Sequence, residues 1–408
     1  MGNQSNVVIV GGGLVGPLIA IALASEGISS TVIDAQKTTI QKANDFDGRA
    51  YALTLTSIRM LDVLGLWDGL VEHAEPIRDI KVSDGVAGAG ASPLFLHFDH
   101  REIEEGPFGH LIEDRYLRRL LLNRVMEEPL VTHLTGTQVI GIENGIVLTD
   151  ARAVKNRQIK GQLVIGCDGR GSKVAQSSGI SRSGWSYSQT SLVCAVEHEL
   201  PHNGIAHQFF TPSGPLAILP LTGNRCSIVW TETEAKAAEI QARDDVSYLD
   251  ALRPVFGDFL GDIKLLGNRY MYPLGLSLAN SFIAERAALA GDAAHGIHPL
   301  AGQGFNLGVR DAAALTEVLV EANRRGEDIG ASDVLERYQR WRRFDTAALA
   351  VATDGINRLF SNDNPLLRAA RDTGLGLVNK VPALRRGLMR EAAGLSGDMP
   401  KLLKGQRI

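Results

Sequence analysis

The sequence predicts an α/β protein that combines a βαβ unit near its start with an antiparallel sheet further along the chain. Short β-rich runs and a glycine-dense turn alternate between Val7 and Ile33. From about Leu192 to Trp230, β-rich runs are separated by Pro and Gly, a pattern typical of antiparallel strands. With 408 residues and 44% hydrophobic content, the chain is long enough to bury a large core in two sub-domains.

The βαβ unit is the first element. Val7 to Val10 and Thr31 to Ile33 are short apolar β-rich runs, and Leu18 to Ala24 between them has helical character. Pro17 falls in the predicted first helical turn, where its missing N–H costs little. The uncharged stretch from Val7 to Ala24 is interrupted by glycines and is preceded by no Lys or Arg, so neither a membrane span nor a signal peptide is predicted.

Further elements follow from hydrophobic periodicity. Arg115 to Glu127 has the pattern of an amphipathic helix, and Leu163 to Ile165 that of a buried strand. Helices are predicted again from Ala312 to about Arg325 and from Val334 to Ala352.

Composition excludes several classes of protein. The net charge of -4 gives no basic footprint for a nucleic-acid partner. The three cysteines, Cys167, Cys194 and Cys226, show no CxxC spacing, so neither a disulfide framework nor a metal site is predicted. A reducing cytoplasm is the expected location.

The carboxyl-terminal segment has a different charge balance. From Asn364 to Ile408 the sequence carries nine basic and three acidic residues. Leu384 and Leu388, four residues apart, give one short helix an apolar side. A solvated terminal helix packed on the body is the favoured interpretation, and a helix that lies on a membrane surface or a partner is the alternative.

A glycine motif identifies the first binding site. Gly11, Gly13 and Gly16 form a G-x-G-x-x-G pattern between the first strand and the helix, and Asp34 ends the next strand. Glycines allow a tight turn and close approach of a pyrophosphate to the helix N-terminus, while the acid accepts hydrogen bonds from ribose hydroxyls. The pattern predicts a bound dinucleotide, but it does not distinguish FAD from NAD.

Two further motifs favour FAD. The sequence CDGRGS from Cys167 to Ser172 resembles the DG motif of flavoprotein hydroxylases, although alone it also fits an Asp-Gly turn after a strand. LAGDAAH from Leu289 to His295 resembles their GD motif, and the run HPLAGQGFNLG from His298 to Gly308, closed by Asp311, matches the signature of ubiquinone-biosynthesis hydroxylases of the UbiH, UbiF and VisC type.

This resemblance implies a p-hydroxybenzoate-hydroxylase-like fold. It contains a Rossmann-like FAD-binding domain (1–76, 102–180 and 285–350), an inserted antiparallel substrate domain (77–101 and 181–284) and a basic helical carboxyl-terminal region (351–408). The implied enzyme is an FAD-dependent monooxygenase in which reduced FAD takes up O2 to give a flavin hydroperoxide that hydroxylates a polyprenylated phenol of ubiquinone biosynthesis. NAD(P)H is the expected reductant, and peripheral contact with the inner membrane or with a ubiquinone-synthesis assembly is an open possibility.

The resemblance also assigns residues. Asp168 is placed near the pyrophosphate, Asp292 on the ribityl hydroxyls, and Arg49 and Arg115 on phosphate or ribose. The loop residues Pro299, Gly302, Gln303 and Gly304 are placed near the reacting ring, where backbone N–H groups and a helix N-terminus stabilise negative charge. The complete set expected to bind the cofactor is Gly11, Gly13, Gly16, Asp34, Arg49, Arg115, Asp168, Asp292, Gly302, Gly304 and Asn306.

No side chain is assigned as the nucleophile or proton donor. His295 and His298 are interpreted first as hydrogen-bonded structural groups, with an acid–base role as the alternative. In the stretch that resembles the family's substrate sheet, side chains fit either the core or the lining of a pocket. These residues are Phe209, Gly214, Pro215, Leu219, Pro220 and Trp230.

Departures from the family pattern leave rival functions open. Asp34 replaces a more usual glutamate, Cys167 a small alanine, and Ala175 an arginine that usually ends the DG motif, which puts the docking of NAD(P)H in doubt. One rival is a soluble hydroxylase of a small aromatic acid. The other is a flavin-binding assembly or redox protein without oxygenase activity.

Overall fold

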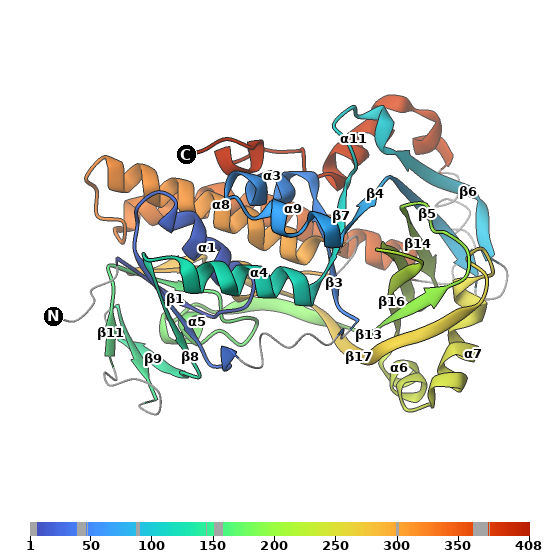
Figure 1. Ribbon diagram of the computed structural model, residues 1–408, viewed down its shortest axis with the longest axis horizontal. Coiled ribbons are helices and arrows are strands. Elements are labelled where there is room, and N and C mark those ends of the chain that lie inside the picture. Colours follow the sequence, from blue (N-terminus) through green and yellow to red (C-terminus); the bar gives the residue numbers. More distant parts are fainter. Residues whose placement is uncertain are drawn as a thin grey trace.

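The computed structural model describes residues 6–38, 46, 48–86, 90–143, 145–150, 158–298, 302–361, 374 and 376–408. Its two largest sheets lie side by side, one mainly parallel and one mainly antiparallel (Figure 1). The predicted α/β fold with a second, antiparallel sheet is therefore confirmed.

The parallel sheet contains the amino-terminal βαβ unit. Its strands, in spatial order, are β18 (Ile283–Ala284), β19 (Ala287–Leu289), β12 (Leu163–Gly166), β1 (Val7–Val10), β2 (Ser30–Asp34) and β8 (Val131–Thr135). All neighbours run parallel except β18 and β19. Every residue of β1 and β12 is buried, as expected for strands that helices cover on both faces.

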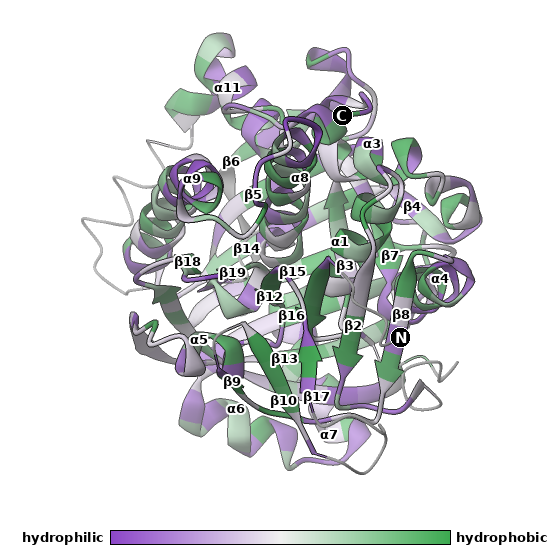
Figure 2. Cartoon of the chain, turned by 90° about the vertical axis from the view of Figure 1, so that its left-hand side faces the viewer, coloured by the Kyte–Doolittle hydropathy of each residue, from purple (hydrophilic) through white to green (hydrophobic). Residues whose placement is uncertain are grey.

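Helices cover this sheet (Figure 2). They are α1 (Val15–Ala24), α4 (Asp114–Glu127), α5 (Lys173–Ser177), α8 (Gln303–Arg324) and α9 (Ser332–Phe360). α1 packs against α8, and α8 packs against α9. Pro17 lies in the first turn of α1, as predicted.

The antiparallel sheet has eight strands. In spatial order they are β20 (His295–Gly296), β17 (Ile263–Ala279), β13 (Arg182–His198), β16 (Arg225–Thr233), β15 (Gly214–Leu221), β14 (Ile205–Thr211), β5 (Asp79–Val86) and β6 (Gly90–Asp99). Only β14 and β5 are parallel neighbours. Two helices, α6 (Glu234–Gln241) and α7 (Asp245–Phe256), form a core with one face.

Two smaller sheets complete the strands that the structure describes. One small sheet contains β3 (Ala50–Thr54), β7 (Gly109–Glu113) and β4 (Ala74–Ile77), and another contains β9 (Val139–Glu143), β10 (Ile146–Thr149) and β11 (Gln158–Lys160). Among the residues that the structure describes, the remaining helices are α3 (Leu55–Val63) and α11 (Pro382–Ala392), with short 3-10 turns η1 (Trp67–Gly69), η2 (Val71–His73), η3 (His100–Glu102), η4 (Gly291–Ala293) and η6 (Lys401–Lys404).

Most predicted elements are present, but their lengths differ. The β-rich stretch from Leu192 to Trp230 lies within β13 to β16, whose neighbours are antiparallel as predicted. The helix predicted from Val334 to Ala352 is α9, which continues to Phe360. The 17-residue strand β17 was not predicted, because much of it is exposed and its residues lack strict alternation. The division into domains stays a prediction.

The carboxyl-terminal segment packs on the body. Met389 in α11 and Leu402 and Leu403 in η6 are buried. Arg310 in α8 donates through Nη2 to the backbone oxygen of Gly394, 2.8 Å away. This packing agrees with the favoured interpretation of the tail, of which residues 364–373 and 375 lie outside the described residues.

We expect Leu403→Ala to lower the free energy of unfolding by roughly 2–5 kcal/mol, because truncation of a buried leucine leaves a cavity. Leu384→Ala is the matched control, since that leucine is 55% exposed and its truncation should have little effect. Urea denaturation of the two variants measures both values. Equal stabilities would show that the tail does not pack as described.

Candidate functional site

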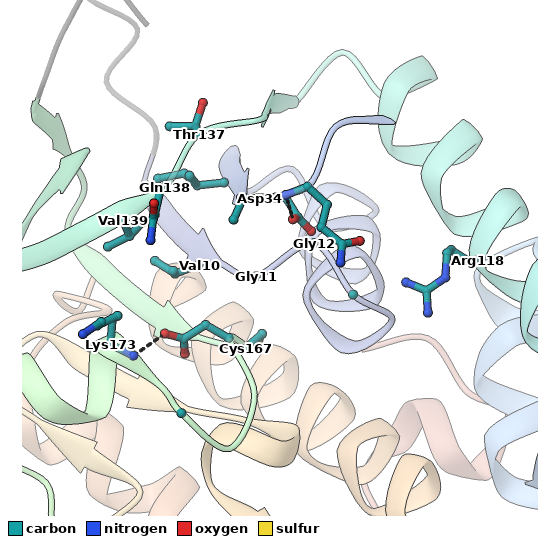
Figure 3. Close-up of a pocket in the computed structure, with 16 residues that line it drawn as sticks. Val10, Gly11, Gly12, Asp34, Arg118, Thr137, Gln138, Val139, Cys167 and Lys173 are labelled. Atoms are coloured by element: carbon teal, nitrogen blue, oxygen red, sulfur yellow. Dashed lines mark hydrogen bonds between the residues drawn. The ribbon is translucent and has the colours of Figure 1, made fainter. Parts of the chain in front are cut away.

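A cavity of about 390 Å³ opens at the carboxyl ends of β1, β2 and β12. Ligands of open α/β sheets bind at this edge. Figure 3 shows the glycine loop at the centre, with Arg118 and Lys173 approaching from different sides. The lining includes Gly11, Gly12, Gly13, Asp34, Gln36, Arg118, Thr137, Gln138, Val139, Cys167, Asp168, Gly171 and Lys173.

Packing alone requires glycine at three positions of the loop. A Cβ atom at Gly11, whose φ is +111°, would lie 2.2 Å from the Cys167 carbonyl oxygen. At Gly16 it would lie 2.0 Å from the Gly11 carbonyl oxygen, and at Gly12 it would lie 2.3 Å from Oδ2 of Asp34. These contacts are closer than non-bonded carbon and oxygen atoms allow, so a side chain at any of these positions would have to displace its neighbours.

Gly13 is different. Apart from Gly13 itself and its two chain neighbours, no heavy atom of the described protein lies within 4 Å of the position that a Cβ would take, and the φ of Gly13 is not positive. Neither packing nor backbone conformation therefore requires glycine at this position. Open space beside a loop that leads into a helix N-terminus fits a bound pyrophosphate, which needs close approach to the backbone.

The charges around the cavity suit a dinucleotide. The first turn of α1 contains no acidic residue that would oppose an anion at the helix N-terminus. Arg118 and Lys173 line the same space, whereas the carboxylate of Asp34 marks the end of β2. Asp34 accepts a hydrogen bond from the backbone N–H of Gln36 at 2.6 Å, which fixes the carboxylate beside the glycine loop.

The aspartate of the DG motif organises the opposite wall. Oδ1 of Asp168 accepts a hydrogen bond from the Ser172 hydroxyl at 2.6 Å, and Oδ2 accepts from the backbone N–H groups of Lys173 and Val174. Asp168 thus stabilises the N-terminus of α5 while it lines the cavity. Burial, followed by the charges of Asp168 and Asp311, raises the pKa of the neighbouring Cys167 thiol, so no thiolate opposes an anionic ligand.

The GD motif lies at the end of the next strand but outside the cavity lining. β19 pairs in parallel with β12, and Asp292 follows it in η4. The Asp292 side chain is 54% exposed and lies 3.6 Å from Nε of Arg170, a residue of the DG motif. The two motifs therefore meet at the same edge of the sheet.

A buried carboxylate holds the GD turn. Oδ2 of Asp311, in α8, accepts hydrogen bonds from the Gly291 N–H at 2.9 Å and from Nε2 of His295 at 2.5 Å. Its Oδ1 accepts from Nε of Arg342 in α9 at 2.8 Å. Although burial alone raises the pKa of Asp311, the charges of His295 and Arg342 outweigh it and hold the pKa below its usual value. His295 is thus part of a structural hydrogen-bond network.

His298 has no such network. It is fully buried, and within the described residues neither ring nitrogen has a hydrogen-bond partner. Its ring lies edge-on to Tyr187 with centroids 5.3 Å apart. Burial lowers the pKa of His298 to about 4, so the imidazole is neutral near pH 7. Pro299, the next residue, lies outside the described residues.

The predicted flavin loop enters α8 through a fixed turn. Gly302 has φ of +64° and immediately precedes the helix, which Gln303 opens, and Gly304 has no neighbour within 4 Å of a potential Cβ in the described protein. Asn306 holds this turn against β3. Its Oδ1 accepts from the Thr54 N–H at 2.9 Å, and its Nδ2 donates to the Ala52 carbonyl oxygen at 2.7 Å.

The arginines occupy different places. Arg49 and Arg118 both pair with Asp114, at 3.2 and 2.7 Å, and Arg118 lines the cavity. Arg115 instead donates through Nε to Glu113 at 2.7 Å and stacks on the Tyr116 ring. The sequence assignment overlooked Arg118, although it lies one helical turn after Asp114 in the predicted amphipathic helix.

The residues named in the substrate sheet divide between two cores. Trp230 is buried under α6 and α7, and Phe209 packs against the same cluster. Leu219 packs on another cluster that includes Ala52 and Leu221. Gly214, Pro215 and Pro220 are buried in β15. Sequence reasoning also overlooked Gly12, Gln36, Lys173 and the Thr137–Val139 segment of the cavity, for which only their positions next to predicted strand ends and motifs gave a signal.

Comparisons with known proteins identify the family. Residues 4–352 match the model of the FAD binding domain family. The chain is 42% identical to Ubiquinone hydroxylase UbiL of Rhodospirillum rubrum over 98% of this chain and 93% of that protein. It is 33% identical to 3-demethoxyubiquinol 3-hydroxylase of Escherichia coli over 97% of this chain and 100% of that protein.

A solved structure has the same fold. The p-nitrophenol 4-monooxygenase PnpA of Pseudomonas putida superimposes with a TM-score of 0.79 at 20% identity, over 97% of this chain and 98% of that one. FAD is thus the cofactor, and the glycine loop with its open space at Gly13 fits it. The chain belongs to the FAD-dependent ubiquinone-biosynthesis hydroxylases, within the p-hydroxybenzoate-hydroxylase-like flavoprotein monooxygenases.

Proposed function

We propose that this enzyme uses FAD and O2 to hydroxylate the aromatic ring of a polyprenylated phenol in ubiquinone biosynthesis. The names of its relatives support the substrate class. The observation that carries the proposal is the meeting of three motifs at one sheet edge, beside a cavity that two of them line and in which Gly13 faces open space. NAD(P)H is the proposed reductant.

The cavity residues would hold the adenosine diphosphate half of FAD. Backbone N–H groups of Gly11 to Gly13 and the N-terminus of α1 bind the pyrophosphate, and Asp34 accepts hydrogen bonds from the ribose. Arg118 supplies positive charge from α4, oriented by Asp114. Asp292, whose carboxylate is half exposed, accepts hydrogen bonds from the ribityl chain.

The remaining residues would control the reaction space. Bound FAD supplies the activation of oxygen. Gly302, Gln303 and Gly304 direct the positive end of α8 toward the flavin, and Asn306 keeps this end fixed against β3. His298, neutral and buried beside Tyr187, adds no charge to that surface. The protein thus orients the ring and excludes water without a nucleophilic side chain.

We also propose that the enzyme works in the cytoplasm, in peripheral contact with the inner membrane or with a ubiquinone-synthesis assembly. Among the described residues, no helix combines the length and apolar character needed to cross a bilayer. The free thiols of Cys167, Cys194 and Cys226 agree with a reducing compartment. The hydrophobic prenyl tail of the proposed substrate gives a physical reason for contact with lipid.

Alanine substitutions in the glycine loop separate packing from cofactor binding. We expect Gly13→Ala to leave the stability of the apoprotein unchanged but to weaken FAD binding by about tenfold or more, because the methyl group enters the pyrophosphate space. Gly12→Ala should destabilise the apoprotein itself, since its Cβ meets Asp34. Thermal unfolding and flavin fluorescence titration report the two effects. Unaltered FAD affinity of Gly13→Ala would contradict this placement.

Oxygen consumption tests the reaction. We expect NAD(P)H oxidation and O2 uptake by the holoenzyme to rise with a short-chain prenylated phenol and not with a plain hydroxybenzoate. Uptake stimulated only by the plain acid would assign a small aromatic substrate instead. A protein that binds FAD but shows no uptake with either phenol, when supplied with NADH, NADPH or a reduced ferredoxin, would be a non-oxygenase flavoprotein.

A further inference from the structure

The solvent side of α9 changes character along the helix. Up to Arg343 its exposed positions include Asp333, Glu336 and Arg340. From Phe344 onward they are almost all apolar, with Phe344 at 78% and Val351 at 73% exposure. We call this surface the α9 stripe, and its exposed residues are Phe344, Ala347, Ala348, Val351, Ala352, Gly355, Ile356 and Leu359.

The stripe is too regular to be a few isolated apolar residues. Its members repeat at helical spacing over four turns, which corresponds to roughly 22 Å of helix at 1.5 Å per residue. Large contiguous apolar patches are rare on proteins that have no partner for them. A packed core does not explain the stripe, because the opposite side of the helix, with Thr346, Ala350 and Thr353, is the buried one.

The exposed charged side chains near the stripe are mainly basic. Within it, Asp345 and Asp354 are only 22% and 17% exposed and pair with arginines, whereas Arg358 is 62% exposed. Figure 2 shows α11 on the same side of the molecule as α9. On α11, Leu384 and Leu388 are exposed together with Arg386 and Arg390, beside one exposed acid, Glu391.

The stripe also lies close to the predicted reaction space. On the buried side of α9, Leu349 and Ala350 pack with Ile297 and Leu307, next to the loop that carries His298. Tyr187, whose ring faces His298, belongs to the same cluster. Only the diameter of one helix, about 10 Å, therefore separates the outer surface from these residues.

We propose that the α9 stripe, together with the exposed leucines and arginines of α11, is the surface that docks on an anionic lipid bilayer. Apolar side chains enter the boundary between head groups and acyl chains, and arginines contact lipid phosphates. This inference rests on the proposed function, since a prenylated phenol resides in the bilayer. Docking through α9 brings the reaction space next to the lipid that holds the substrate.

The composition of the surface favours lipid over a second protein. The stripe is rich in alanine and glycine and presents no exposed carboxylate between Phe344 and Leu359. Protein interfaces instead concentrate aromatic residues with matched polar groups.

Two valines provide a matched test. Val351 in the stripe and Val246 on α7 are 73% and 71% exposed, and both lie on helices. We expect the holoenzyme to sediment with vesicles of phosphatidylcholine and phosphatidylglycerol more than with phosphatidylcholine alone. Val351→Asp should weaken this binding by about tenfold, while Val246→Asp leaves it unchanged. FAD content and O2 uptake with a water-soluble phenol analogue should be equal in all three proteins.

Several outcomes would overturn the lipid surface. The proposal is wrong if the wild-type protein does not bind anionic vesicles. It is also wrong if the Val351→Asp variant binds them as well as the wild type does. A wild-type dimer in light scattering that Val351→Asp dissociates, without vesicle binding, would assign the stripe to a second copy. The proposed reaction is tested separately, because O2 uptake is measured without vesicles and can fail while vesicle binding persists.

Discussion

The cavity depends on close contacts of the glycine loop at the carboxyl edge of the parallel sheet, where no side chain fits at Gly11 or Gly12. The loop after β1 touches the loop after β12 at Gly11 and Cys167, and it touches the end of β2 at Gly12 and Asp34. Because these positions are filled by the protein itself, the glycine pattern is partly a packing requirement. Only Gly13 is left to face open space, so the same short loop both closes the sheet edge and leaves room for a pyrophosphate.

Buried polar groups then fix the second half of the site. Asp311 connects α8, the GD turn and α9 through hydrogen bonds to Gly291, His295 and Arg342. Such a network is stable in the core because its carboxylate is fully paired, and loss of one partner would leave a buried charge. Asn306 acts similarly between the start of α8 and β3. The position of Asp292 and the direction of α8 therefore follow from contacts that involve no cofactor.

Much of this arrangement was predictable, because its signals are local. The G-x-G-x-x-G pattern, Asp34 and the DG and GD motifs each follow a strand, and the sheet order makes those strands neighbours. Arg118 was not identified, since its role depends on which face of α4 meets the cavity. The capping role of Asp168 and the hydrogen bonds of Asn306 depend on three-dimensional contacts that a sequence pattern does not specify. The α9 stripe was overlooked for the same reason, since an alanine-rich helix has the same sequence pattern in a core as on a surface.

We propose that the glycine-loop cavity holds the adenosine diphosphate half of FAD. Titration of the apoprotein with FAD, FMN and riboflavin, with ADP as a competitor, tests this placement. We expect FAD to bind at least about tenfold more tightly than FMN, because only FAD reaches Gly13 and Asp34, and we expect ADP to weaken FAD binding. Equal affinity for FAD and FMN, with no effect of ADP, would contradict it.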